Sequence, residues 1–139
     1  APACMGQYDH LHLTVVQKPE ILAQINAAFR KAVNDPNMQV TYGAPTVIYV
    51  SCKNEDEEII KGCNAGVVME NMLLEAADLG LGAVYLFGVS QVLFANEEIT
   101  KLLQIPEGFR TVSAIAVGTS ADDLQERILG TDKISMTTL

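Results

Sequence analysis

The segment from Asn64 to Gly88 constrains this chain more than any other part of its sequence. Its first part reads as a helix that ends at Gly80, and its polar residues form only a narrow stripe: Glu70, Asn71, Glu75 and Asp78. A helix that is apolar around most of its circumference must be buried on most sides. A chain of 139 residues has little interior in which to surround such a helix. We therefore expect a second copy of the chain to cover it, in an obligate homodimer.

The length and composition describe one folded domain over residues 1–139. The net charge of −8 and the scattered Lys and Arg residues argue against a nucleic-acid partner. No apolar run reaches the roughly 18 residues that a membrane-spanning helix needs. The three cysteines are odd in number and match no zinc spacing, so we expect no metal site and a reducing, cytoplasmic setting.

Apolar periodicity and turn residues predict the secondary structure. Strands are expected over 11–17, 46–52, 83–87 and 110–118, and helices over 20–33, 64–80 and 96–104. Asn96 is the expected N-cap of the last helix, because Asn is favoured there and two glutamates follow it. Four strands mixed with three helices predict an α+β fold in which helices flank a mixed sheet.

Side chains that could carry out catalysis by themselves are few. His10 and His12 flank Leu11 in an expected strand, and we assign both a structural or surface role. No serine lies in a GxSxG turn, and no GxGxxG motif joins a strand to a helix. Such a chain either is not an enzyme or takes its reactivity from a cofactor, as flavoproteins do.

Three segments resemble the nitroreductase family of FMN-dependent oxidoreductases. The run from Asn71 to Gly82 is similar to the family's NLLLAAxxLGLG, and an apolar strand with Tyr85 follows it. Residues 103–110, LQIPEGFR, are similar to the family's LxIPEGYR, and Ala114–Gly118 is similar to its ALIAVGYP strand. The resemblance implies a nitroreductase-like fold, an intertwined homodimer and FMN as cofactor. It also implies that a hydride passes from NAD(P)H through flavin N5 to a nitroaromatic, a quinone or a similar small-molecule acceptor.

The resemblance also implies which residues lie at the flavin. The opening segment is similar to the family's APSxxNxQPWxFxVV loop, which wraps the cofactor, so four residues are expected there: Pro2, Ala3, Cys4 and Gly6. Ala3 and Gly6 stand where the family has Ser and Asn, which leaves backbone groups to make the contacts.

The remaining implied contacts come from later in the chain. Leu86, Phe87 and Gly88 are expected beside the isoalloxazine ring, with backbone N–H groups near N5. Arg127 stands roughly where the family has a late Arg that reaches the phosphate. Because the chemistry would take place on the flavin, no protein side chain is expected to be a catalytic residue.

Three departures from the family leave a second interpretation open. The Pro-Trp pair of the opening loop is missing, and Glu126 replaces the Lys beside Arg127. The family's RRSxR motif would lie before Ala1, so the chain is expected to be truncated at its N-terminus relative to the family. The alternative is a degenerate, cofactor-free relative that binds a small molecule or an interaction partner.

Overall fold

The structure is a computed structural model of the chain, and it describes residues 6–93, 96–122, 126, 128, 130 and 133–139. Its elements are, in order, η2 (Tyr8–His10), β1 (Leu11–Val16), α1 (Pro19–Val33), β2 (Thr46–Lys53), α2 (Glu58–Asp78), β3 (Gly82–Tyr85), α3 (Phe87–Leu93), α4 (Glu97–Leu102) and β4 (Phe109–Gly118). The strands form a sheet in the order β1-β2-β4-β3. This arrangement confirms the predicted α+β fold.

The strands of the described sheet are antiparallel in every pairing, so this sheet is not mixed. β2 and β4 occupy the centre of the sheet and are buried on both faces. A strand that is apolar on both faces is common in parallel sheets, and its composition does not reveal its direction. Strand direction was therefore beyond what the apolar runs could predict.

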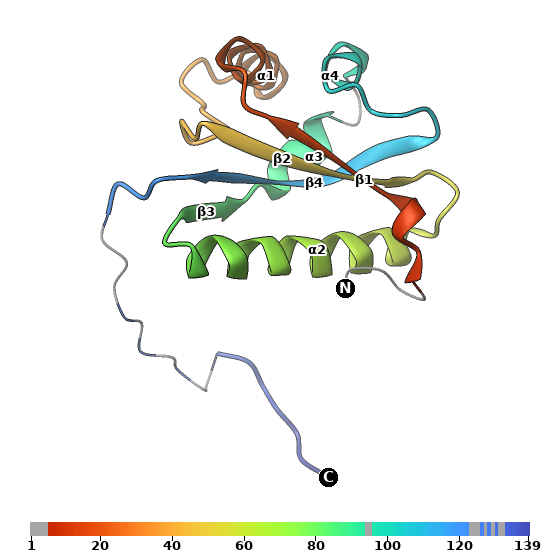
Figure 1. Cartoon of the computed structure of the whole chain (residues 1–139), viewed down its shortest axis with the longest axis vertical. Helices are drawn as coiled ribbons and strands as arrows, with labels where there is room; N and C mark the ends of the chain where they lie inside the picture. Colours follow the sequence, from red (N-terminus) through yellow and green to blue (C-terminus); the bar gives the residue numbers. More distant parts are fainter. Residues whose placement is uncertain (1–5, 94–95, 123–125, 127, 129, 131–132) are drawn as a thin grey trace.

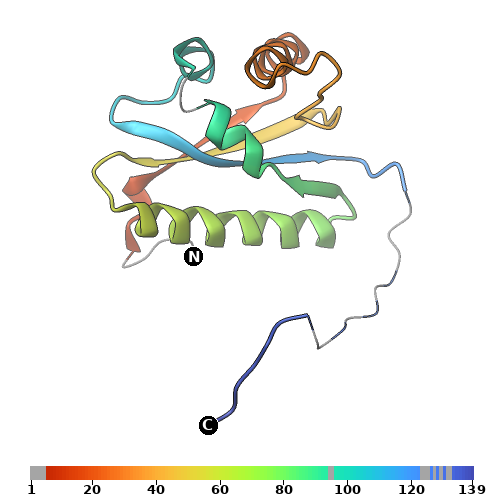
Figure 2. The same cartoon turned by 180° about the vertical axis from the view of Figure 1, so that it is seen from behind.

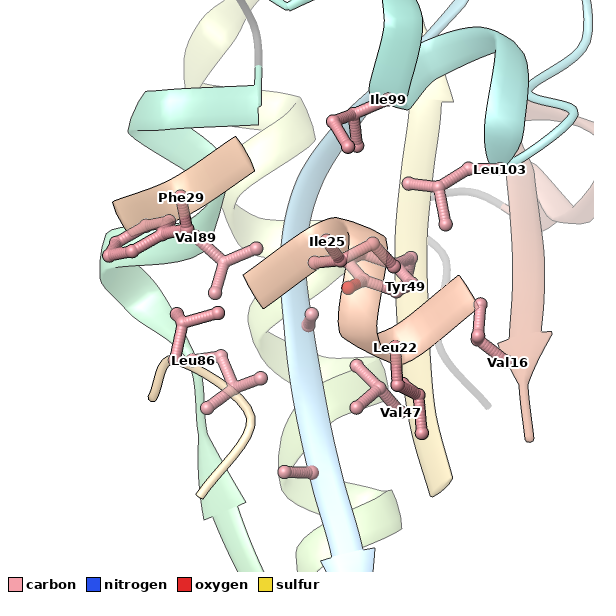
Figure 3. Close-up of a cluster of buried hydrophobic side chains, with 13 residues drawn as sticks. Val16, Leu22, Ile25, Phe29, Val47, Tyr49, Leu86, Val89, Ile99 and Leu103 are labelled. Atoms are coloured by element: carbon pink, nitrogen blue, oxygen red, sulfur yellow. The ribbon is translucent and has the colours of Figure 1, made fainter. Parts of the chain in front are cut away.

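Helices cover both faces of the sheet (Figure 1). We call the face covered by α1, α3 and α4 the upper face, and the face covered by α2 the lower face. β2 alternates between them, since Val47 and Tyr49 enter the upper core while Val50 and Cys52 enter the lower core. Figure 3 shows the upper core, where Ile25 of α1 lies over Tyr49. Cys52 is fully buried there.

The central helix α2 begins at Glu58, six residues before the predicted start at Asn64. The acidic run that precedes it suits a helix N-terminus, because negative charge there interacts favourably with the helix dipole. The predicted end is confirmed: the helix stops at Asp78, and Gly80 follows with a φ of +69°. That left-handed conformation favours a residue without a Cβ.

The short helix α3 was not predicted. The strand expected to continue to Phe87 ends at Tyr85, so that prediction is wrong at its C-terminal end, and α3 begins at Phe87. The buried side chains of Leu86 and Val89 turn this segment into the upper core. Asn96 caps α4 as predicted by accepting hydrogen bonds from the N–H groups of Glu98 and Ile99.

The lower face is less fully covered than the upper face. α2 packs on β2, β3 and β4. On the edge strand β1, Leu13 and Val15 remain 48% and 56% exposed. The outer side of α2 carries further exposed apolar side chains, namely those of Ile59, Val67 and Leu74. None of the helices in the described part of the chain is long and apolar enough to cross a bilayer.

Candidate functional site

Four of the residues expected at the cofactor, Pro2, Ala3, Cys4 and Arg127, lie outside the described residues. Gly6 is described: it is exposed and has a φ of +73°. Apart from its chain neighbours, no described residue has a heavy atom within 4 Å of the position that a Cβ would occupy on Gly6. The roles of these residues therefore stay predictions, and the described part of the candidate site is the turn between β3 and α3.

Leu86 is the structural anchor of this turn. Its side chain is only 3% exposed and lies in the upper core with Val89 (Figure 3). Its backbone N–H donates a hydrogen bond of 2.8 Å to the carbonyl oxygen of Ala114 in β4. The sheet thus already uses the Leu86 N–H, and the next residues of the turn must supply any backbone donor for a ligand.

The residues on either side of Leu86 face outward. Tyr85 is 39% exposed and Phe87 is 62% exposed. Gly88 lies in the first turn of α3, where N–H groups have no partner within the helix. Outside its own helix turn, no heavy atom of the described residues lies within 4 Å of its would-be Cβ, so a Cβ there would meet open space. An exposed aromatic side chain beside the first N–H groups of a helix suits a planar ring with a hydrogen-bond acceptor at its edge, as isoalloxazine has.

A pair of polar side chains, His10 and Asp56, joins the segment before β1 to the loop between β2 and α2. His10 Nδ1 lies 2.7 Å from Asp56 Oδ1, and these side chains are 19% and 7% exposed. Beside them, Lys53 Nζ donates to Asp9 Oδ2 at 3.0 Å. The predicted structural or surface role of His10 fits this pairing, but His10 ends η2 and does not lie in the strand. Asp56 lies among Glu55, Glu57 and Glu58, and nothing in this acidic run singles it out as the partner of His10.

The start of α2 is held by a buried cation. Lys61 is 3% exposed, and its Nζ donates to the Asn54 carbonyl at 2.9 Å and to Glu58 Oε1 at 3.1 Å. The Glu58 carboxylate also pairs with Arg110 of β4. Hydrogen bonds from Lys61 and then Arg110 lower the pKa of Glu58 below its ordinary value. These contacts fix the helix start against the sheet.

The nearby thiol is not a nucleophile. Burial raises the pKa of Cys52 to about 11, so its sulfur stays protonated near neutral pH. Within the described ranges, no group of three His, Cys, Asp or Glu side chains could hold a metal ion. The described residues therefore offer a surface for a planar ligand and a polar network that shapes the fold.

The sequence and the fold both match known proteins. The model of the nitroreductase family matches residues 7–119. A curated protein from Methanothermobacter thermautotrophicus, described as a candidate NADH dehydrogenase/NAD(P)H nitroreductase, is 32% identical over 116 residues. That match covers 81% of this chain and 56% of the relative, so the chain spans about half the length of this relative.

Two solved structures share the fold over nearly the whole chain. A nitroreductase with bound FMN from Bacteroides fragilis has a TM-score of 0.80 and 22% identity, and the match covers 99% of this chain and 81% of that one. A nitroreductase with bound FMN from Desulfitobacterium hafniense has a TM-score of 0.82 and 20% identity, and the match covers 99% and 80% of the two chains.

Proposed function

The chain belongs to the nitroreductase family, and from this premise we propose that it is an FMN-dependent NAD(P)H oxidoreductase. The observation that carries the proposal is the family match over residues 7–119, which includes the open turn from Tyr85 to Gly88. The two structural neighbours named above carry bound FMN, and the description of the curated relative names NAD(P)H. These relatives support the proposal by similarity, and the exposed turn from Tyr85 to Gly88 supports it in this chain itself.

The residues of the chain would bind and orient the flavin. Phe87 would lie against the isoalloxazine ring, and the Gly88 N–H would donate to an acceptor at the ring edge. The loop containing Pro2, Ala3, Cys4 and Gly6 would wrap the cofactor, and Arg127 would pair with its phosphate as a bidentate donor. Bound FMN would supply hydride transfer at N5 from NAD(P)H to an electron-poor nitroaromatic, quinone or similar acceptor.

The same proposal includes a homodimer built on α2. The outer side of this helix exposes Ile59, Val67 and Leu74, which are 69%, 44% and 60% exposed in the single chain. Gly62 and Gly66 lie between them, and a Cβ at either position would meet open space. Glycines on a helix surface let another helix approach closely, and apolar neighbours gain free energy when water leaves the contact. A second copy would thereby cover the helix that a short chain cannot surround.

The direct test is an FMN titration of the purified chain, followed by absorbance and flavin fluorescence. We expect stoichiometric uptake, a yellow protein and FMN-dependent oxidation of NADH or NADPH in the presence of a nitroaromatic or quinone. A protein that stays colourless at saturating FMN would contradict the proposal and favour the cofactor-free alternative.

Arg127 gives a sharper form of this test. A hydrogen bond to a charged group contributes about 1.5–3 kcal/mol. Arg127→Ala should therefore weaken FMN binding roughly ten- to a hundredfold and leave the fold unchanged. Arg30→Ala on α1 is the matched control, because the Arg30 Nε already donates to the Met38 carbonyl within the fold. Equal FMN affinities for wild type and Arg127→Ala would remove Arg127 from the site.

A further inference from the structure

We propose that the part-buried His10–Asp56 pair positions residues 6–9, which precede β1, for the flavin; this inference rests on the proposed function. Asp56 lies in the loop between β2 and α2, and His10 lies 46 residues earlier, at the end of η2. His10 Nδ1 and Asp56 Oδ1 lie 2.7 Å apart and form a hydrogen bond. The pair therefore ties the segment that leads into the expected cofactor loop to the rigid end of the sheet.

The burial of the pair argues for a positioning role. The Asp56 side chain is 7% exposed, and its second oxygen, Oδ2, is buried with no hydrogen-bond partner in the described part of the chain. Burying a carboxylate costs free energy, and a single partner compensates only part of that cost. Such a pair contributes little to stability, yet it fixes one geometry, because the Asp56 carboxylate left alone would be buried without a partner.

The position of His10 is transmitted to the loop through a short turn. The His10 N–H donates to the carbonyl of Gln7 at 3.2 Å, so the placement of His10 fixes Gln7 and, through the chain, Gly6. The Gln7 Oε1 atom is itself buried and has no hydrogen-bond partner among the described residues, so Gln7 packs into the fold at this turn.

The test compares FMN dissociation constants, measured by flavin fluorescence, across a small set of variants. Asp56→Ala and His10→Ala should each weaken FMN binding about tenfold, because the loop loses its anchor. The double variant should be no weaker than either single variant, since both remove the same contact. Asp56→Asn keeps an acceptor for His10 without the charge, so its FMN affinity should fall only about threefold.

Asp9→Asn is the matched control, because it removes a carboxylate from the same turn. The Asp9 side chain is 77% exposed; it pairs with Lys53 and lies 3.8 Å from His10 Nε2, on the surface, where ion pairs contribute little. We expect its FMN affinity to match that of the wild type within about twofold. Thermal unfolding of the apoprotein is measured for every variant, so that a general loss of stability is separated from loss of the loop.

The possible outcomes decide between the two proposals. Equal FMN affinities for wild type, Asp56→Ala and Asp56→Asn would overturn the positioning role, as would additive losses in the double variant. If Asp56→Ala does not fold, the isosteric Asp56→Asn carries the test. If the wild type binds no FMN, the proposed function fails, and hydrogen exchange decides the inference. Amides of residues 6–10 must then exchange faster in Asp56→Ala or Asp56→Asn than in Asp9→Asn, and unchanged exchange would overturn the anchor itself.

Discussion

The upper and lower faces of the sheet are built from the same strands but are closed to different extents. On the upper face, three helices bury a core that includes Ile25, Phe29, Tyr49 and Leu103. On the lower face, α2 alone buries a smaller core around Val50, Met69 and Ile115. Leu13 and Val15 of β1, which lie on this face, and the outer side of α2 remain exposed.

The difference separates a face that the described helices cover from one that they cover only in part. Single exposed apolar residues are normal on a monomer, so the proposed dimer rests on the exposed apolar residues of α2 and β1 taken together. The apolar residues of the upper face are buried by its own helices, so substitutions there should lower the free energy of unfolding. Apolar residues on the outer side of α2 are exposed, so substitutions there should change the dimer dissociation constant.

The largest effect is expected in the upper core. Ile25 is fully buried, so Ile25→Ala removes apolar contacts and leaves a cavity that should cost about 2–5 kcal/mol of unfolding free energy. Ile59→Ala is the matched control on the lower side, where the same residue type is 69% exposed. In dilute chain, Ile59→Ala should change stability by less than about 0.5 kcal/mol. Urea denaturation measures both, and similar losses would break the distinction between the faces.

A charge on the outer side of α2 should act on the dimer. Leu74→Glu would bury an unpaired carboxylate between two copies, so we expect the dimer dissociation constant to rise at least about a hundredfold. Val33→Glu places the same residue on an exposed position of α1 and should leave the dimer intact. Sedimentation equilibrium distinguishes them. A wild type that sediments as a monomer at micromolar concentration would refute the dimer altogether.

The smallest effects concern two helical glycines with open space around them, Gly66 on α2 and Gly88 on α3. In either helix an alanine should be favoured by up to about 1 kcal/mol on propensity alone. If the surfaces are occupied as proposed, Gly66→Ala should weaken the dimer severalfold and leave FMN binding unchanged. Gly88→Ala should weaken FMN binding severalfold and leave the dimer unchanged. If both variants raise the free energy of unfolding but change neither the dimer dissociation constant nor the FMN affinity, neither surface is used.

Much of the fold was predictable because its signals are local. The runs LHLTVV and TVIYVSC have the composition of strands, Gly80 supplies the left-handed conformation that ends α2, and Asn96 caps α4 with its own side chain. Each of these features depends on residues within a few positions of one another. The start of α2 at Glu58 was harder to predict, because an acidic run suits both a solvated loop and a first helical turn.

The candidate site was predictable only in part. The resemblance pointed to residues 86–88, and the structure places Phe87 and Gly88 on an open surface. That Leu86 is buried, with its N–H bonded to Ala114, depends on the pairing of β3 with β4. The contact between His10 and Asp56 joins positions 46 residues apart. Neither residue carries a local signal that names its partner.

The sequence by itself thus determined the elements, the α+β class and the apolar character of α2, because propensity, caps and periodicity act over short distances. Only the tertiary structure decided the antiparallel direction of the strands and the existence of α3. It also decided which side of α2 faces the sheet and which faces outward. The reason is physical: these features depend on which residues distant in the chain meet in the packed core. That choice follows from burying the most apolar surface at once rather than from any single segment.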